Sequence, residues 1–381
     1  MSRKSVIVCV ILIALVPLGC NLSSTATPTV IPIHTATPPV ETASVPPLPS
    51  KPPVPTATAT AAPSELPALI ATDTPAPAST PDASIYIDDR STPSQVIVSL
   101  YNAINRREYL RAYNYWTDPA SSLGDFLAYA AGYQDTASVA LVFGQITGEP
   151  GMSQVYYTVP VILKTVTKPG VHTNFAACYV VHATSPNVYG APPFYPMGIE
   201  RGTAKASDIH TSDAAALSTA CDGYPVGSNP VSVSGTSLTI DKTNFLDNRS
   251  GPIETVSSFL NALNLKQYVR AYYYFQAPTS FPGAYDPFAA GYADTDSITV
   301  NFGTVQSEGA AGSLYYKVPL ALHMLTTSNS QQTFVGCYML RFVQPAIQGT
   351  PPFQPMGIIS GKFSQVINST DVIPLLPTAC N

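Results

Sequence analysis

Cysteines are the residues of this 381-residue chain whose type and spacing most directly predict chemistry. Four of them form two pairs with equal spacing, Cys178 with Cys221 and Cys337 with Cys380. Thiols placed in this way can form disulfides or bind a metal ion. The sequence contains no CxxC motif, which disfavours a zinc site. We therefore expect disulfides, which form in a chain that reaches an oxidising compartment.

The N-terminus indicates that the chain is exported. Arg3 and Lys4 precede an apolar run over residues 6–16, and "PLGC" then ends at Cys20. As a helix this run rises only about 16 Å, too short for a hydrocarbon core of about 30 Å. Residues 1–20 resemble a bacterial lipoprotein signal, which implies cleavage after Gly19 and a lipid on the Cys20 thiol. Pro17 replaces the usual leucine of that motif, so ordinary signal cleavage, or an uncleaved anchor, is the alternative.

Residues 21–83 are rich in proline, threonine and alanine and carry few charges. Proline fixes φ and removes an amide donor, so neither a helix nor a sheet can propagate through this segment. Such a composition favours polyproline II, a semi-rigid spacer that rises about 3.1 Å per residue. We expect a disordered stalk that holds the remainder of the chain away from the membrane.

Beyond the stalk, the chain contains two copies of one sequence. A shift of 159 positions aligns residues 87–221 with residues 246–380 without a gap, and about 50 of these 135 positions are identical. The octapeptide "PPFYPMGI" at residues 192–199 recurs as "PPFQPMGI" at residues 351–358. So long a period indicates a domain duplication rather than a solenoid. We assign repeat 1 to residues 84–222, a Gly/Ser/Pro-rich linker to residues 223–242, and repeat 2 to residues 243–381.

The duplication selects among the possible disulfides. Four cysteines permit three pairings. If each repeat folds alone, Cys178 must pair with Cys221, and Cys337 with Cys380. Each bond would close a loop of 43 residues and, in the chain-entropy model, add about 4 kcal/mol to the free energy of unfolding.

Each repeat begins with helix signals and continues with strand signals. Thr92-Pro93-Ser94-Gln95 is typical of a helix start, with threonine at the N-cap and glutamine at the third helical position. A second short helix is expected from Tyr109, and a third ends near Gly132. After Thr136, segments rich in β-branched and aromatic residues predict antiparallel strands. Helices followed by such strands make an α+β domain.

This order resembles the NTF2-like family, also called SnoaL-like or cystatin-like α+β. The resemblance rests on the helix ending "NAINRREYLRAYNYW" and on the short helices and strands that follow it, and it covers both repeats. It implies two tandem cone domains, each with N-terminal helices against a curved antiparallel sheet. The family includes enzymes, binding domains and structural partners, so the fold does not select a function.

Few charged residues recur in both repeats. The shared pairs are Asp88/Asp247, Arg90/Arg249, Arg111/Arg270, Asp135/Asp294 and Glu149/Glu308. We expect Arg111 to form a structural ion pair with Asp135, and Arg270 with Asp294. Alternatively, the same groups in a partly desolvated cone could bind a polar ligand.

Aromatic residues are the second recurring feature. The chain has 22 tyrosines, and their helical and strand spacing favours packing in the core, with stacking on a sugar or peptide as the alternative. In the first octapeptide we expect Phe194 and Met197 to point inward in a rigid loop. The alternative is a recognition loop at the rim of the cone.

Composition limits the function classes. The net charge is −5 and no basic block occurs, so we expect no nucleic-acid partner. No histidine recurs between the repeats, and no cofactor or metal motif is recognisable. We expect a lipid-anchored, extracytoplasmic protein with a non-enzymatic binding or scaffolding role, which contacts the membrane through its lipid and an envelope protein, peptide or glycan through its domains. The alternative is a SnoaL-like small-molecule enzyme that uses one cone pocket.

Overall fold

The computed structural model describes residues 78–224, 227, 229–230, 240 and 242–381. The predicted signal region with Cys20, most of the predicted stalk and part of the linker lie outside the described residues. Both repeats belong to one compact unit. In the part of the chain that is described, no helix is both long and apolar enough to cross a membrane.

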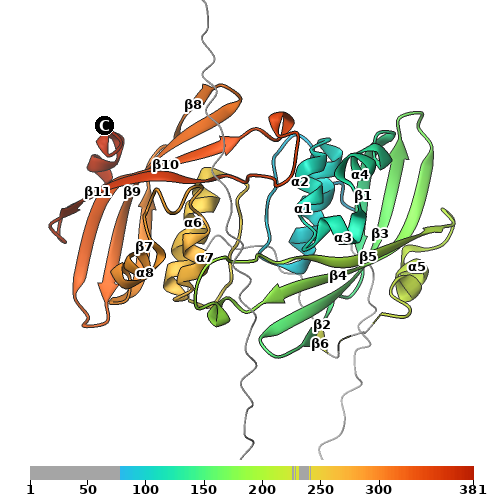
Figure 1. The fold of residues 1–381 in the computed structure, drawn as a ribbon, viewed down its shortest axis with the longest axis horizontal. Coiled ribbons are helices and arrows are strands. Elements are labelled where there is room, and N and C mark those ends of the chain that lie inside the picture. The colour runs from blue at the N-terminus through green and yellow to red at the C-terminus, as the bar shows by residue number, and fades with distance from the viewer. Residues whose placement is uncertain (1–77, 225–226, 228, 231–239, 241) are drawn as a thin grey trace, which may run out of the picture. The chain divides into compact units, whose positions relative to one another are not determined.

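Repeat 1 is an α+β unit (Figure 1). Its N-terminal helices are α1 (Pro93–Asn105), α2 (Tyr109–Tyr113), α3 (Pro119–Leu123) and α4 (Phe126–Gly132). The strands are β1 (Thr136–Phe143), β2 (Thr147–Pro150), β3 (Gln154–Thr167), β4 (His172–Thr184) and β5 (Gly198–Ser207), with the short helix η1 (Pro186–Val188) before β5. Helix α5 (Asp213–Ala220) and the two-residue strand β6 (Asn229–Pro230) follow.

Repeat 2 has the same order of elements in its described residues, without counterparts of α3 and β6. Its helices are α6 (Pro252–Asn264), α7 (Tyr268–Tyr272) and α8 (Tyr285–Gly291). The strands are β7 (Thr295–Phe302), β8 (Gln306–Ala310), β9 (Ser313–Thr326), β10 (Gln331–Val343) and β11 (Gly357–Val366). The helix η2 (Pro345–Ile347) precedes β11, and η3 (Ile373–Thr378) takes the place of α5.

Each repeat contains one antiparallel sheet. The strand order is β5-β4-β3-β2-β6 in repeat 1, with β1 also beside β3, and β11-β10-β9-β7 in repeat 2, with β8 also beside β9. The long strand β3 pairs with β2 through residues 155–158 and with β1 through residues 161–167. Strand β9 divides between β8 and β7 in the same way. The predicted α+β class with antiparallel sheets is therefore confirmed.

Helices pack on both faces of the sheet in repeat 1. Helix α1 begins where the sequence predicted, because the Thr92 hydroxyl accepts a hydrogen bond from the Gln95 amide at 3.2 Å. Alternate residues of β3 face opposite sides: Val161 and Leu163 pack in the cluster that includes α1, whereas Ile162 packs with Ala216 of α5. Figure 1 shows α5 on the side of the strands away from α1.

Repeat 1 begins earlier than the sequence indicated. Ser79 exchanges two backbone hydrogen bonds with Leu141 of β1, at 2.9 and 2.8 Å. Asn102 of α1 donates its side-chain amide to the carbonyl oxygen of Asp82 at 2.7 Å. Residues 79–83, which the sequence assigns to the stalk, therefore pack on repeat 1, because α1 and β1 supply partners for their backbone.

Candidate functional site

The two repeats meet through a short pair of extended segments, residues 88–91 and 247–250. The amide of Arg90 donates to the carbonyl of Asp247 at 2.7 Å, and the amide of Arg249 donates to the carbonyl of Asp88 at 2.6 Å. The two bonds are equivalent, because Arg90 corresponds to Arg249 and Asp88 corresponds to Asp247 in the two repeats. Such reciprocal contacts are those of an isologous interface, so the repeats associate as two subunits of a homodimer would.

Buried polar side chains surround this junction. In repeat 1 the Tyr115 hydroxyl donates to Asp88 Oδ1 at 2.8 Å, and the Arg90 guanidinium lies 4.4 Å from the Tyr115 ring centroid. In repeat 2, Tyr274 donates to Asp247 Oδ1 at 2.8 Å, and Arg249 lies 4.4 Å from the Tyr274 ring. Each arginine is thus held between a tyrosine face and the backbone that it contacts.

Arg90 and Arg249 also hold the two octapeptides. Arg90 Nη1 donates to the carbonyl of Met197, and Arg249 Nη1 donates to that of Met356, both at 2.8 Å. Phe194 and Met197 are buried, as predicted, and so are Phe353 and Met356. The octapeptide recurs because in each repeat it is fixed by an arginine of the junction.

The predicted ion pairs between Arg111 and Asp135 and between Arg270 and Asp294 are wrong. Asp135 and Asp294 are exposed. Arg111 is buried, and its Nε donates to Glu108 at 2.7 Å while Nη2 donates to Asn102 at 2.8 Å. Arg270 is bound by Gln267 and Asn261 at the same distances. These two guanidinium groups are fixed by residues on their own and the preceding helix.

The charged cavity at the junction has no room for a ligand. It is lined by Asp88, Arg90, Asn114, Asp247, Arg249, Tyr273 and Pro355, and its volume is about 10 Å³. A single water molecule requires about 10–15 Å³ on this measure. Among the recurring charged residues, Asp88, Arg90, Asp247 and Arg249 therefore serve the junction itself.

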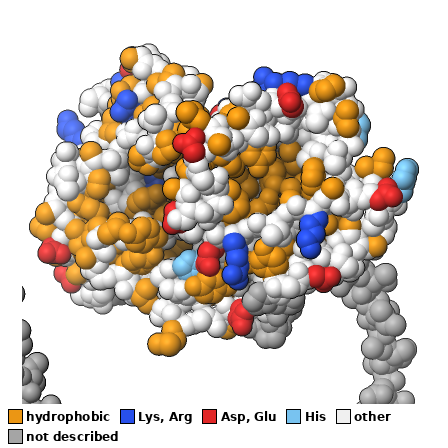
Figure 2. Space-filling model, turned by 45° about the vertical axis from the view of Figure 1, so that its right-hand side comes forward, with side chains coloured by type: hydrophobic (Ala, Val, Ile, Leu, Met, Phe, Trp, Pro, Cys, Tyr) orange, Lys and Arg blue, Asp and Glu red, His pale blue; other side chains and the backbone are white. Residues whose placement is uncertain are grey.

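A larger groove lies between the two octapeptides. Its volume is about 600 Å³, within the usual range of small-molecule sites. We call it the interrepeat groove; its walls include Pro193, Phe194, Tyr272, Tyr273, Phe275, Phe353 and Gln354. Figure 2 shows one face of the molecule, on which hydrophobic side chains gather in and around hollows.

A second pocket adjoins the interrepeat groove. It has a volume of about 390 Å³ and contains Trp116 and His182. Phe194 and Tyr273, whose ring centroids lie 5.5 Å apart, line both spaces and form the wall between them. Because Tyr273 belongs to repeat 2 and Phe194 to repeat 1, this wall exists only when the repeats are joined.

The interior of each repeat is occupied by aromatic side chains. In repeat 1 the hydroxyls of Tyr101 and Tyr179 are 2.5 Å apart, and both rings are buried. In repeat 2, the ring centroid of Phe259 lies 5.4 Å from that of Phe275 and 5.8 Å from that of Tyr338. Burial raises the pKa of Tyr101, Tyr179 and Tyr338, so their phenols stay neutral. For these tyrosines, packing in the core is confirmed.

Two histidines lie beside neutral partners. His182 Nε2 is 3.2 Å from Gln154 Oε1, and its ring stacks on Tyr156 with centroids 4.7 Å apart. His323 lies 3.0 Å from Asn301 Oδ1 and 3.3 Å from Thr333 Oγ1. Among the described residues, no three His, Cys, Asp or Glu side chains lie together as metal ligands would.

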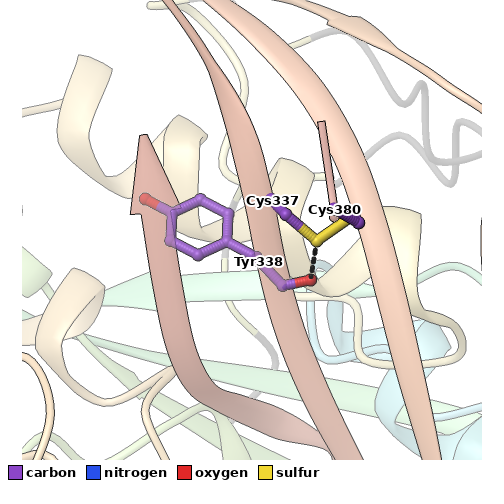
Figure 3. The surroundings of a disulfide bond; sticks show 3 residues. All are labelled: Cys337, Tyr338 and Cys380. Atoms are coloured by element: carbon purple, nitrogen blue, oxygen red, sulfur yellow. Dashed lines mark hydrogen bonds between the residues drawn. A yellow bond between two sulfur atoms is a disulfide. The ribbon is translucent and has the colours of Figure 1, made fainter. Parts of the chain in front are cut away.

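Both predicted disulfides are present. Cys178 of β4 is bonded to Cys221 after α5, and Cys337 of β10 is bonded to Cys380 after η3. Figure 3 shows the second bond, with the Tyr338 side chain directed away from it and the Tyr338 carbonyl 3.6 Å from the Cys337 sulfur. Each disulfide ties the C-terminal segment of a repeat to a central strand. Two disulfides are typical of an extracytoplasmic protein.

Sequence reasoning missed the residues that join the repeats. Asp88 and Arg90 were among the recurring charged residues, and their closeness in the chain was the only available signal. No family model, no curated protein and no solved structure matches this chain.

Proposed function

We propose that the protein is a lipid-anchored binding or scaffolding protein of the cell envelope, and that the interrepeat groove is its binding site. The single observation that carries this proposal is the groove of about 600 Å³ whose walls come from both repeats. A duplicated domain that joins into one unit, with an aromatic and proline-lined groove at the junction, has the usual features of a ligand site.

The recurring charges support binding rather than catalysis. The guanidinium groups of the half-buried Arg90 and of the buried Arg111, Arg249 and Arg270 donate to backbone and side-chain acceptors within the fold. In repeat 1, Tyr101 and Tyr179 occupy the space between α1 and the sheet, where a SnoaL-like enzyme would hold its substrate. We therefore favour a non-enzymatic role over that alternative.

The assignment of each repeat to the NTF2-like family is part of the proposal. It is supported by the order of helices and strands and by the pairing of the long strands β3 and β9 with two shorter strands each. The partners proposed for the groove are an envelope protein, a peptide or a glycan. The ring of Tyr273, which is only partly buried, offers a face for stacking or apolar contact.

Retention of the soluble chain, residues 21–381, on isolated cell envelopes tests the binding site. The variant Gln354→Trp places a large ring in the groove at an exposed position. We expect it to reduce retention at least about tenfold, a loss of about 1.4 kcal/mol. The matched control is Gln365→Trp at an exposed position of β11 outside the groove. Equal retention of the two variants would contradict the proposal.

The lipid anchor is tested separately. We expect Cys20→Ser to release the protein into the medium or to leave the signal region uncleaved. Membrane retention and mass that are both unchanged from the wild-type protein would exclude lipidation of Cys20. That outcome would leave the groove proposal intact.

A further inference from the structure

A pocket with no charged lining residue lies beside Ala183 near the end of β4. Its volume is about 310 Å³, and its apolar walls include Tyr157, Ala183, Phe194, Met197 and Phe245. Serine, threonine, glutamine and tyrosine side chains supply the polar groups of the lining. We call it the Ala183 pocket. Phe245 belongs to repeat 2, so this space too depends on the joining of the repeats.

The equivalent place in repeat 2 contains an aromatic ring. A shift of 159 positions relates Ala183 to Phe342 and Tyr86 to Phe245. The Tyr86 and Phe342 ring centroids lie 4.8 Å apart with an interplanar angle of 68°, an edge-to-face contact. Tyr86 thus packs on Phe342 in repeat 2 as Phe245 would pack on a ring at position 183 of repeat 1.

Smaller side chains in repeat 1 therefore account for part of this space. Ala183 carries only a methyl group, and Val155 on the neighbouring strand replaces the larger Leu314. A cavity of about 150 Å³ lined by apolar side chains is enough to bind benzene. A volume of about 310 Å³ accepts a substituted ring.

We propose that the Ala183 pocket binds an uncharged aromatic molecule of the phenol type, with its ring in the position that the Phe342 ring takes in repeat 2. The hydroxyl and amide groups of Ser153, Gln154 and Thr184 suit a single polar substituent. A charged ligand is disfavoured because no lining residue would compensate its charge. The Ala183 pocket is distinct from the interrepeat groove, so this site goes beyond the binding function proposed above.

The probe is 4-fluorophenol, followed by fluorine NMR with the chain of residues 21–381 at neutral pH. We expect saturable binding to the wild-type protein. Ala183→Phe fills the pocket with the side chain that repeat 2 has at this position, and it should weaken binding at least about tenfold. The charged analogue 4-fluorobenzoate should bind the wild-type protein more weakly by a similar factor.

The reciprocal variant Phe342→Ala opens the equivalent space in repeat 2. We expect it to create a second site, so that about twice as much 4-fluorophenol is bound at saturation as by the wild-type protein. This second site would support the proposal even if Ala183→Phe does not fold. Circular dichroism of the aromatic residues checks the fold of both variants.

Absence of saturable binding, or equal binding by wild-type and Ala183→Phe, would overturn this proposal. Retention on envelopes reports the groove independently, because Gln354 does not line the Ala183 pocket. Failure of the probe and failure of the groove variant are therefore distinguishable.

Discussion

The backbone amide of Asp88 donates a hydrogen bond to the hydroxyl of Ser250, 162 positions further along the chain, at 2.9 Å. The reverse contact also exists, since the amide of Asp247 donates to the Ser91 hydroxyl at 2.8 Å. Each repeat thus supplies the hydroxyl that satisfies a buried amide of the other. Because of these contacts, the folded state of each repeat stabilises the folded state of the other.

The first prediction concerns these two serines. Ser91→Ala and Ser250→Ala each leave an amide without its hydroxyl partner, and Asp88 and Asp247 are almost fully buried. We expect each variant to lower the free energy of unfolding by about 1–3 kcal/mol, measured by urea denaturation. The exposed Ser364→Ala on β11 is the control. A loss no larger than that of the control would mean that water replaces the hydroxyl.

The second prediction compares Tyr86 with its counterpart Phe245. The Tyr86 hydroxyl donates to Asp88 Oδ2 at 3.1 Å. Phe245 has no hydroxyl, and the equivalent Asp247 Oδ2 is buried without a hydrogen-bond partner. The two rings lie alike, 4.4 Å from the Arg111 guanidinium and 4.5 Å from that of Arg270. We infer that the orphaned oxygen results from this single difference between the repeats.

Exchanging the two side chains should therefore have opposite effects. Tyr86→Phe should lower the free energy of unfolding by about 1 kcal/mol, and Phe245→Tyr should raise it by about 1 kcal/mol, as one hydrogen bond is lost or gained. Thermal and urea unfolding measure both changes. If Phe245→Tyr destabilised the protein, the new hydroxyl would not reach Asp247.

A third prediction concerns the partner of Arg111. Glu108 bridges Arg106 and Arg111, whereas the equivalent Gln267 binds only Arg270, because Leu265 replaces Arg106. Glu108→Gln keeps an acceptor for Arg111 and should cost about 1 kcal/mol of unfolding free energy. Glu108→Ala leaves a buried guanidinium without its anion and should cost about 3 kcal/mol.

Denaturation of both variants distinguishes charge from hydrogen bonding at this site. The exposed Glu149→Ala is the control for loss of a carboxylate. Equal losses for Glu108→Gln and Glu108→Ala would show that the charge matters and the acceptor does not.

The fourth prediction is a dependence of stability on alkaline pH. Burial raises the pKa of Tyr115, Tyr179 and Tyr274 in the folded protein, whereas an unfolded tyrosine ionises near pH 10. Because the pKa of these tyrosines is higher in the folded than in the unfolded protein, their neutral phenols contribute fully to stability below about pH 10. That contribution is lost as the pH rises above this value. We expect unfolding in this range, with these phenols ionising as the fold is lost.

Ultraviolet absorbance of phenolate and circular dichroism, recorded on the same samples, test this prediction. Ionisation of the buried tyrosines should coincide with loss of the folded signal. Tyr179→Phe removes one such phenol and should make the decline of stability with pH shallower. Complete ionisation of all tyrosines in a protein that stays folded would refute the argument.

Local features were predictable from the sequence where neighbouring residues set them. Thr92 caps α1 because its hydroxyl reaches an amide three residues away. The partner of Arg111 was not predictable, since recurrence in both repeats indicates that Arg111 and Asp135 matter but not which way their side chains point, and Asp135 is exposed. Glu108, three residues from Arg111 across the start of α2, was the nearer acceptor.

The sequence by itself determined the duplication, the succession of N-terminal helices and antiparallel strands in each repeat, and the two disulfides. Its period and its cysteine spacing contain that information directly. Only the tertiary structure decided that residues 88–91 and 247–250 join the repeats and that the interrepeat groove and the Ala183 pocket lie where they meet. Those contacts link residues more than 150 positions apart, and the direction of each side chain there depends on the packing of two complete domains.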